Sequence, residues 1–167
     1  MNAVAEQLPQ HVPALRRYAR ALTGDAHNAD DLVQDCLERS LERAHQWREG
    51  NLRAWLFTIM HNLHANDRRR VASRPRLAAI DDVPEPSRAA SQFEELSARQ
   101  TFATLKQLPE EQRQVLLLVA LEGLRYAEVA EVLGIPLGTV MSRLSRARDR
   151  LRDLMAGGPA AEPRRAV

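Results

Sequence analysis

Apolar residues recur three or four positions apart along almost every patterned segment of this chain, and no segment shows the alternation of a strand. The clearest case is YAEVAEVLGIPLGTVMSRLSRARDRL, residues 126–151, in which two helical patterns are separated by Gly134-Ile135-Pro136. Glycine permits the left-handed residue that ends a helix, and proline prevents its continuation. We therefore predict two helices joined by a tight turn here, within a chain that is all-α.

The second helix of this pair separates its apolar and polar residues. Its apolar positions fall within one stripe that must face a core: Val140, Leu144, Ala147, Leu151 and Leu154. Ser142 lies almost opposite the stripe, flanked by Ser145 and Arg146. Two helices joined by a short glycine-containing turn form a helix-turn-helix, whose second helix enters the DNA major groove. Serine and arginine suit base-edge contacts there, although an αα-hairpin with a solvated arginine face remains the alternative.

The basic residues are gathered in two places. Lys106 is the only lysine, so arginine carries nearly all of the positive charge behind a pI near 9.2. Residues 68–76 hold five arginines and no acid, and residues 143–152 hold five arginines and one acid, Asp149. Between them lies an acidic stretch that contains Asp81, Asp82 and Glu85. Two basic blocks on either side of an acidic spacer suggest two contacts with a polyanion.

Several classes of protein are disfavoured by the sequence. One cysteine allows no internal disulfide, and the longest apolar run, residues 115–121, is too short to span a membrane. The five histidines form no metal-ligand pattern, and neither a glycine-rich phosphate loop nor a nucleophile elbow is present. We therefore expect a soluble cytoplasmic protein that is not an enzyme, inserts into no membrane and needs no cofactor or metal.

The helical patterns divide into two groups. Helices are predicted over residues 12–22, from an N-cap at Asp25 to about residue 44, and over residues 52–71. The proline-containing segment 73–90 is predicted to be a linker. A helix near residues 92–107, one starting at Pro109, and the 126–151 pair follow it. The predicted domains are residues 1–72 and 91–156, with residues 157–167 as a disordered tail.

The helix that begins after Asp25 has one apolar and one polar face. The apolar face is predicted to be buried and includes Ala29, Leu32, Val33, Cys36, Leu37, Ser40, Leu41 and Ala44. Cys36 is expected to be a packed thiol rather than a reactive one. The opposite face, from Asp30 to Arg43, carries only charged and amide side chains.

Three segments resemble bacterial sigma factors, especially the small extracytoplasmic-function group. ADDLVQDCLERSLER resembles region 2.2, NLRAWLFTIMHNLHANDRRR resembles regions 2.3 and 2.4, and GLRYAEVAEVLGIPLGTVMSRLSRAR resembles region 4. The resemblance covers roughly residues 10–155 in the right order, with a linker where the family has one. It implies a region 2-like three-helix bundle and a region 4-like helix-turn-helix domain joined by a flexible linker.

The resemblance assigns contacts to particular residues. The family contacts core RNA polymerase through the β′ clamp helices and the β flap. The resemblance assigns the contact with the clamp helices to Asp31, Gln34 and Asp35. The −10 element falls to Trp47, Asn62, Asn66, Arg68, Arg69 and Arg70, with Trp55 more suited to the core. The −35 element falls to Gly138, Thr139, Met141, Ser142, Arg143, Ser145 and Arg146. Among these, Thr139 and Arg143 suit phosphate contacts, and Ser142, Ser145 and Arg146 suit base reading.

The chain also departs from relatives at informative positions. Thr58 and Ile59 stand where housekeeping sigma factors place a tryptophan pair that wedges the duplex open. The small group shares this departure. This implies weaker melting and stricter demands on promoter sequence. Met141 stands where relatives often have a basic residue, so a phosphate or base contact is missing. The acids at 81, 82 and 85 either enter the polymerase cleft or only keep a tether soluble.

Three functions remain open at this point. A sigma factor would use both domains, and the resemblance implies control by an anti-sigma factor. A stand-alone regulator that binds operators as a dimer would leave the first domain without a role. A sigma mimic that only sequesters an anti-sigma factor would generally be joined to a receiver domain, which this sequence lacks.

Overall fold

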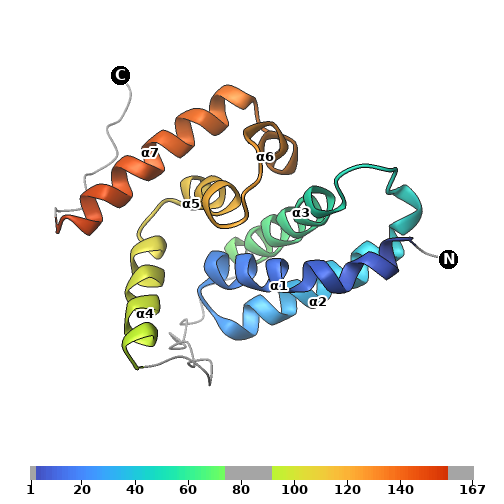
Figure 1. Ribbon diagram of the computed structural model, residues 1–167, viewed down its shortest axis with the longest axis horizontal. Coiled ribbons are helices and arrows are strands. Elements are labelled where there is room, and N and C mark those ends of the chain that lie inside the picture. Colours follow the sequence, from blue (N-terminus) through green and yellow to red (C-terminus); the bar gives the residue numbers. More distant parts are fainter. Residues whose placement is uncertain (1–2, 74–91, 158–167) are drawn as a thin grey trace.

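The computed structural model describes residues 3–73 and 92–157, with the side chains of residues 92–98 excepted. Within these residues every regular element is helical, which confirms the predicted all-α class. The predicted linker, except Ser73, and nearly all of the predicted tail lie outside the described residues. Figure 1 shows three N-terminal helices packed beside four C-terminal ones.

The N-terminal group contains α1 (Ala3–Thr23), α2 (Ala26–Glu42) and α3 (Leu52–Ala72), with a 3₁₀ turn, η1 (Ala44–Gln46), after α2. Asp25 is the N-cap of α2, as predicted: its Oδ1 accepts hydrogen bonds from the backbone N–H groups of His27 at 2.7 Å and Asn28 at 3.2 Å. Asn51 caps α3 in the same way through Ala54 N–H at 3.2 Å. These caps accept hydrogen bonds from backbone N–H groups that the first turn of a helix leaves unpaired, so the side chains of Asp25 and Asn51 fix where the two helices begin.

The core of this group lies where the three helices meet. Tyr18 of α1 and Phe57 of α3 are both almost completely buried, and their rings pack edge to face with centroids 5.1 Å apart. Leu56 and Met60 fill the space around them at 0 % exposure. The predicted inward face of α2 is buried at Ala29, Leu32, Val33, Cys36 and Ser40.

Three details of the sequence prediction are wrong. Helix α1 begins at Ala3 rather than near Val12, although Pro9 and Pro13 lie inside it. Each proline removes a backbone donor, but burial of Val4 and Leu8 offsets that cost. Leu41, expected on the buried face, is 45 % exposed because α2 ends one residue later, although Ser40 in the same turn is buried. Pro109 is the N-cap of the following helix and not its first helical residue.

The C-terminal group contains α4 (Gln92–Lys106), α5 (Glu110–Leu116), a π-helical turn η2 (Leu117–Leu121), α6 (Tyr126–Leu133) and α7 (Leu137–Met155). Its core joins α5 to the α6–α7 pair through side chains that are fully buried: Val115, Leu118, Val129, Val140 and Ala147. A π-helical turn adds one residue to a helix and is often found at functional sites. Here it turns Glu122, the next residue, inward to 3 % exposure.

The two groups are in contact. Helix α6 packs against α3, as Figure 1 shows, and η2 packs against α1. The buried side chains of both groups form one continuous hydrophobic cluster. The sequence alone left the relative placement of the two groups open.

Candidate nucleic-acid and polymerase interface

The α6–α7 pair has the geometry of a helix-turn-helix. Gly134 ends α6 in the left-handed conformation, with φ 64° and ψ 37°, and Pro136 is the N-cap of α7. Val140 and Leu144 on α7 are 0 % and 2 % exposed, and Leu151 and Leu154 pack against the same core. The stripe predicted from the sequence therefore holds α7 against the domain and leaves its other side free.

The outward side of α7 carries the candidate −35 residues. Gly138, Met141, Ser142, Ser145 and Arg146 are all exposed. Near the start of the helix, the Ser142 hydroxyl donates a hydrogen bond to the backbone carbonyl of Thr139 at 3.1 Å. These residues form one continuous surface that begins at the N-terminal end of α7, the end that reads bases in a helix-turn-helix.

Arg143 lies apart from that surface. Its side chain is 23 % exposed, and Nη2 lies 3.3 Å from an Oε2 of Glu111 at the start of α5. The sequence assigned Arg143 to a phosphate contact on the evidence of its position in the motif. In the chain on its own, the guanidinium already has a carboxylate partner within its own domain.

The candidate −10 residues gather at the C-terminal half of α3. Asn62, Asn66 and Arg69 are exposed, and Arg70 lies 3.8 Å from Asp67. Arg68 forms an ion pair with Glu110 of the C-terminal group. Trp47 lies apart from them, directly after η1, and is half-buried against the core. Trp55 on α3 is also half-buried against the core.

The polar face of α2 is exposed as predicted. Asp31, Gln34 and Asp35 all face solvent. Gln34 Nε2 donates to Glu38 at 3.0 Å, and Asp31 lies 3.4 Å from His27. An open groove of about 620 Å³ runs from this face to the end of α3, and its lining is mostly charged: Asp35, Glu38, Arg39, Glu42, Leu63, Asn66, Asp67, Arg69 and Arg70. The candidate polymerase and −10 residues therefore border the same groove.

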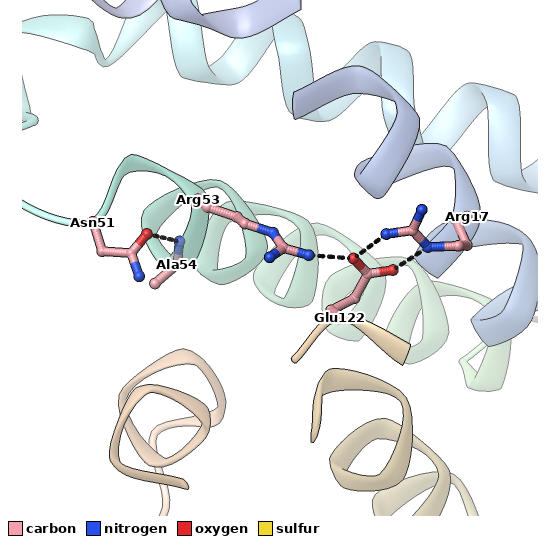
Figure 2. Close-up of polar contacts among 5 residues, drawn as sticks. All are labelled: Arg17, Asn51, Arg53, Ala54 and Glu122. Carbon is pink, nitrogen blue, oxygen red and sulfur yellow. Dashed lines mark hydrogen bonds and ion pairs between the residues drawn. The ribbon is translucent and has the colours of Figure 1, made fainter. Parts of the chain in front are cut away.

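Sequence reasoning missed three glutamates that join the two groups. The carboxylate of Glu122 accepts from Arg17 Nε at 3.0 Å and Nη2 at 2.8 Å, and from Arg53 Nη2 at 2.6 Å, as Figure 2 shows. Glu128 Oε1 accepts from Asn51 Nδ2 at 2.6 Å, and Glu110 pairs with α3. The partners of Glu122 lie 105 and 69 residues away, so no local pattern could reveal them.

Glu128 stabilises the start of α6 while it contacts α3. Its carboxylate accepts from both the side chain and the backbone N–H of Arg125, at 3.0 and 2.8 Å. The Arg125 hydrogen bonds, with a smaller contribution from Asn51, lower the pKa of Glu128 to about 2. The residue therefore stays ionised throughout the physiological range.

The two α3 histidines form no metal site. Nε2 of His64 lies 3.0 Å from Oε1 of Glu110, and burial, followed by the charges of Arg68 and Arg113, lowers the pKa of His64 to about 4. Burial also lowers the pKa of His61. Among the described residues, no three potential metal ligands are grouped together. His64 is neutral near pH 7 and donates an ordinary hydrogen bond to Glu110.

Cys36 is a packed thiol. Its side chain is completely buried, and Sγ donates to the carbonyl of Leu56 at 3.5 Å. Burial raises the pKa of the thiol to about 12, so the reactive thiolate is scarce at neutral pH. The expectation from its place on the apolar face of α2 is confirmed.

The fold and its exposed surfaces define a helix-turn-helix protein with a second helical domain. Residues 8–61 match the family model described as the Sigma2 domain of PhyR, and residues 93–151 match Sigma-70, region 4. The ECF RNA polymerase sigma factor EcfG of Rhodopseudomonas palustris is 40 % identical over 160 residues, which cover 92 % of this chain and 86 % of the relative. The chain belongs to the extracytoplasmic-function RNA polymerase sigma factors.

Solved structures agree with this assignment. The sigma factor RpoE from Bartonella quintana, in complex with the anti-sigma factor NepR, is 31 % identical with a TM-score of 0.75, over 93 % of this chain and 98 % of that one. CnrH, in complex with the cytosolic domain of CnrY, is 26 % identical with a TM-score of 0.70, over 94 % and 90 %. As a sigma factor, the chain binds core RNA polymerase and directs initiation at promoters.

Among the described residues, no helix combines the length and the apolar character that crossing a bilayer requires.

Proposed function

We propose that the two helical groups divide promoter recognition between them, with α7 reading the −35 element and α3 holding the −10 element. The observation that carries the first half is the exposed serine and arginine face of α7, opposite a stripe that is buried at Val140, Leu144 and Ala147. Ser142, Ser145 and Arg146 would contact base edges, while Thr139 and Arg143 would contact phosphates. Arg143 would exchange Glu111 for a phosphate oxygen when DNA binds.

Replacement of Arg146 tests this surface. An Arg146→Ala variant is expected to lose about 1–3 kcal/mol of binding at one −35 base pair and to relax the preference there, because a bidentate base contact is removed. The measurement is transcription, or holoenzyme binding, on promoters that carry every base at each −35 position. Arg148→Ala is the matched control, since Arg148 is also an exposed arginine of α7. Equal weakening on all −35 variants would instead make Arg146 a phosphate contact.

The second half of the proposal concerns α3. Sites that hold unstacked single-stranded bases combine a cationic rim with polar and stacking side chains. The exposed ends of Asn62, Asn66 and Arg69 supply the polar and cationic groups on one helix. Trp47 is half-buried, so it would stack on a base only at its exposed edge. Position along the promoter would be set by Arg68, Arg69 and Arg70 through phosphates.

The exposed face of α2 is proposed to dock on the β′ clamp helices of core polymerase. Its support is the exposure of Asp31, Gln34 and Asp35 on a helix whose opposite face is buried from Ala29 to Cys36. We expect Asp35→Ala to weaken binding to core polymerase severalfold in a competition assay, with unchanged helicity by circular dichroism. Glu6→Ala, which removes an exposed acid from α1, should bind as the unmodified chain does. Equal affinity for Asp35→Ala would remove this residue from the docking surface.

We also propose control by an anti-sigma factor in the cytoplasm. The structural relative from Bartonella quintana is bound to one. On α7 of this chain, Leu137 and Met141, the second of which is itself a candidate −35 residue, are 48 % and 53 % exposed. Apolar side chains of this size favour a protein partner that would cover them in the inactive state.

One experiment separates this function from its rivals. A promoter library is transcribed by bacterial core polymerase with and without the chain, and transcripts from a shared two-element promoter that need the chain support the proposal. The PhyR family match over residues 8–61 favours one other candidate, a decoy that binds anti-sigma factors. A decoy would give no transcripts on its own but would restore transcription by an inhibited sigma factor. Tight binding of duplex DNA without polymerase would favour an operator-binding regulator. We propose no enzymatic activity for the chain.

A further inference from the structure

Acidic residues of the C-terminal group meet polar and basic residues of the N-terminal group along one seam. Glu122 contacts Arg17 of α1 and Arg53 of α3, Glu110 contacts His64 and Arg68 of α3, and Glu128 contacts Asn51, the N-cap of α3. Together these three glutamates reach the first turn, the N-cap and the C-terminal half of α3. The seam therefore pairs acidic side chains with the start and with the C-terminal half of that helix.

Glu122 is the centre of this seam. Its side chain is 0 % exposed, and among the described side chains it is the only buried acid. Both of its partners come from the other group, as the dashed contacts in Figure 2 show, and Arg17 and Arg53 remain 49 % and 34 % exposed. A buried carboxylate is stable only when it is paired and hydrogen-bonded. Glu122 can therefore stay buried only while the two groups remain in contact.

The same seam occupies donors that a nucleic acid would use. Glu110 pairs with Arg68, one of the residues proposed to contact −10 phosphates. A carboxylate and a phosphate bind a guanidinium through the same charge-assisted hydrogen bonds, so they compete for it. Helix α6 also contacts α3, the helix proposed to hold the unstacked strand. The closed seam and a bound strand therefore compete for Arg68, while Asn62, Asn66 and Arg69 stay exposed in the closed arrangement.

We propose that this closed arrangement is an autoinhibited state of the free chain, with Glu122 as the latch that holds α6 and η2 against α1 and α3. The inference rests on the proposed role of α3 in holding the −10 strand. Opening exposes Glu122, Arg17 and Arg53 to water, where each is well solvated, so the latch is reversible. Nucleic-acid phosphates and the surface of core polymerase favour the open form by taking over the released arginines.

The test uses the full chain and two variants that break the latch from opposite sides. Glu122→Gln keeps the size of the side chain but removes its charge and turns an amide donor toward the arginines. Arg17→Gln removes the bidentate partner from α1. Both should increase the radius of gyration measured by small-angle X-ray scattering, relative to the unmodified chain, with unchanged helicity. Glu131→Gln, an exposed acid of α6, is the matched control and should scatter as the unmodified chain does.

A second readout asks whether the closed form is inhibitory. Binding of a short, labelled single-stranded DNA of random sequence is measured by fluorescence anisotropy. Affinity should rise in both latch variants, by up to about tenfold if the open form is about a tenth of the unmodified molecules. Adding Arg69→Ala to Glu122→Gln should reverse part of the gain, because Arg69 is proposed to contact the bound strand. Arg69 makes no contact in the seam, so the change does not act through the latch.

The outcomes are distinct. Unchanged scattering in both variants would overturn the latch, and an enlarged radius without tighter DNA binding would overturn autoinhibition. If scattering and affinity rise but Arg69→Ala has no effect, the role proposed for α3 fails while the latch stands. Transcription with core polymerase is measured in parallel. If the unmodified chain supports no transcription, that result counts against the proposed function and leaves the latch untouched.

Discussion

A Phe57→Ala variant is expected to lose about 3–5 kcal/mol of unfolding free energy, the usual cost of truncating a buried aromatic side chain. Phe57 is 0 % exposed and sits at the centre of the N-terminal core. Its ring packs edge to face with Tyr18 at 5.1 Å, and the guanidinium carbon of Arg53 lies 5.7 Å from its centroid. Truncation leaves a cavity between α1 and α3 and removes a surface that orients Arg53 toward Glu122.

This loss is large compared with the total stability of a domain, which is about 5–15 kcal/mol. Urea unfolding followed by circular dichroism measures it, with Val71→Ala as the control on the same helix. Val71 is 70 % exposed, so its replacement should change stability by no more than about 0.5 kcal/mol. A cost below about 1 kcal/mol for Phe57→Ala would mean that the surrounding side chains collapse into the space.

Local patterns predicted the helices that one amphipathic face and one cap define. Asp25 and the period of α2 fix that helix from residues close together in the sequence, and the stripe from Val140 to Leu154 fixes α7 in the same way. The first turns of α1 were missed because Pro9 and Pro13 oppose a helix locally. The burial of Val4 and Leu8 in a core that α2 and α3 help to form reverses that preference, and no local window contains it.

The candidate site divides along the same line. Which side chains of α2 and α7 face solvent could be predicted from helical period, except at Leu41, where α2 ends one residue later. What those side chains contact could not, since Arg68 finds Glu110 and Arg143 finds Glu111 only after the chain has folded. Glu122 shows this most clearly. In the sequence it is an ordinary acid before a glycine, and only packing of η2 against α1 makes it a buried ion.

The second large effect concerns pH, and it arises where α3 meets α5. His64 has a side chain that is 12 % exposed, and its folded-state pKa is lowered to about 4 from an ordinary value near 6.5. Between these values the unfolded chain binds a proton that the folded chain does not. The unfolding free energy contributed by His64 is therefore complete above about pH 6.5 and is lost as the pH falls toward 4. A difference of this size corresponds to roughly 3 kcal/mol.

A His64→Gln variant should keep the hydrogen bond to Glu110 and lose this pH dependence. Urea unfolding of both proteins at intervals from pH 7 to about 4.5 gives the difference between them, in which the titration of the shared carboxylates and of His61 largely cancels. The unmodified chain should lose stability more steeply on acidification. His45→Gln, an exposed histidine of η1, should follow the unmodified chain. Parallel curves for His64→Gln and the unmodified chain would mean that His64 has the same pKa in the folded and unfolded chains. A shallower loss of stability in the unmodified chain would mean that protonated His64 forms an ion pair with Glu110.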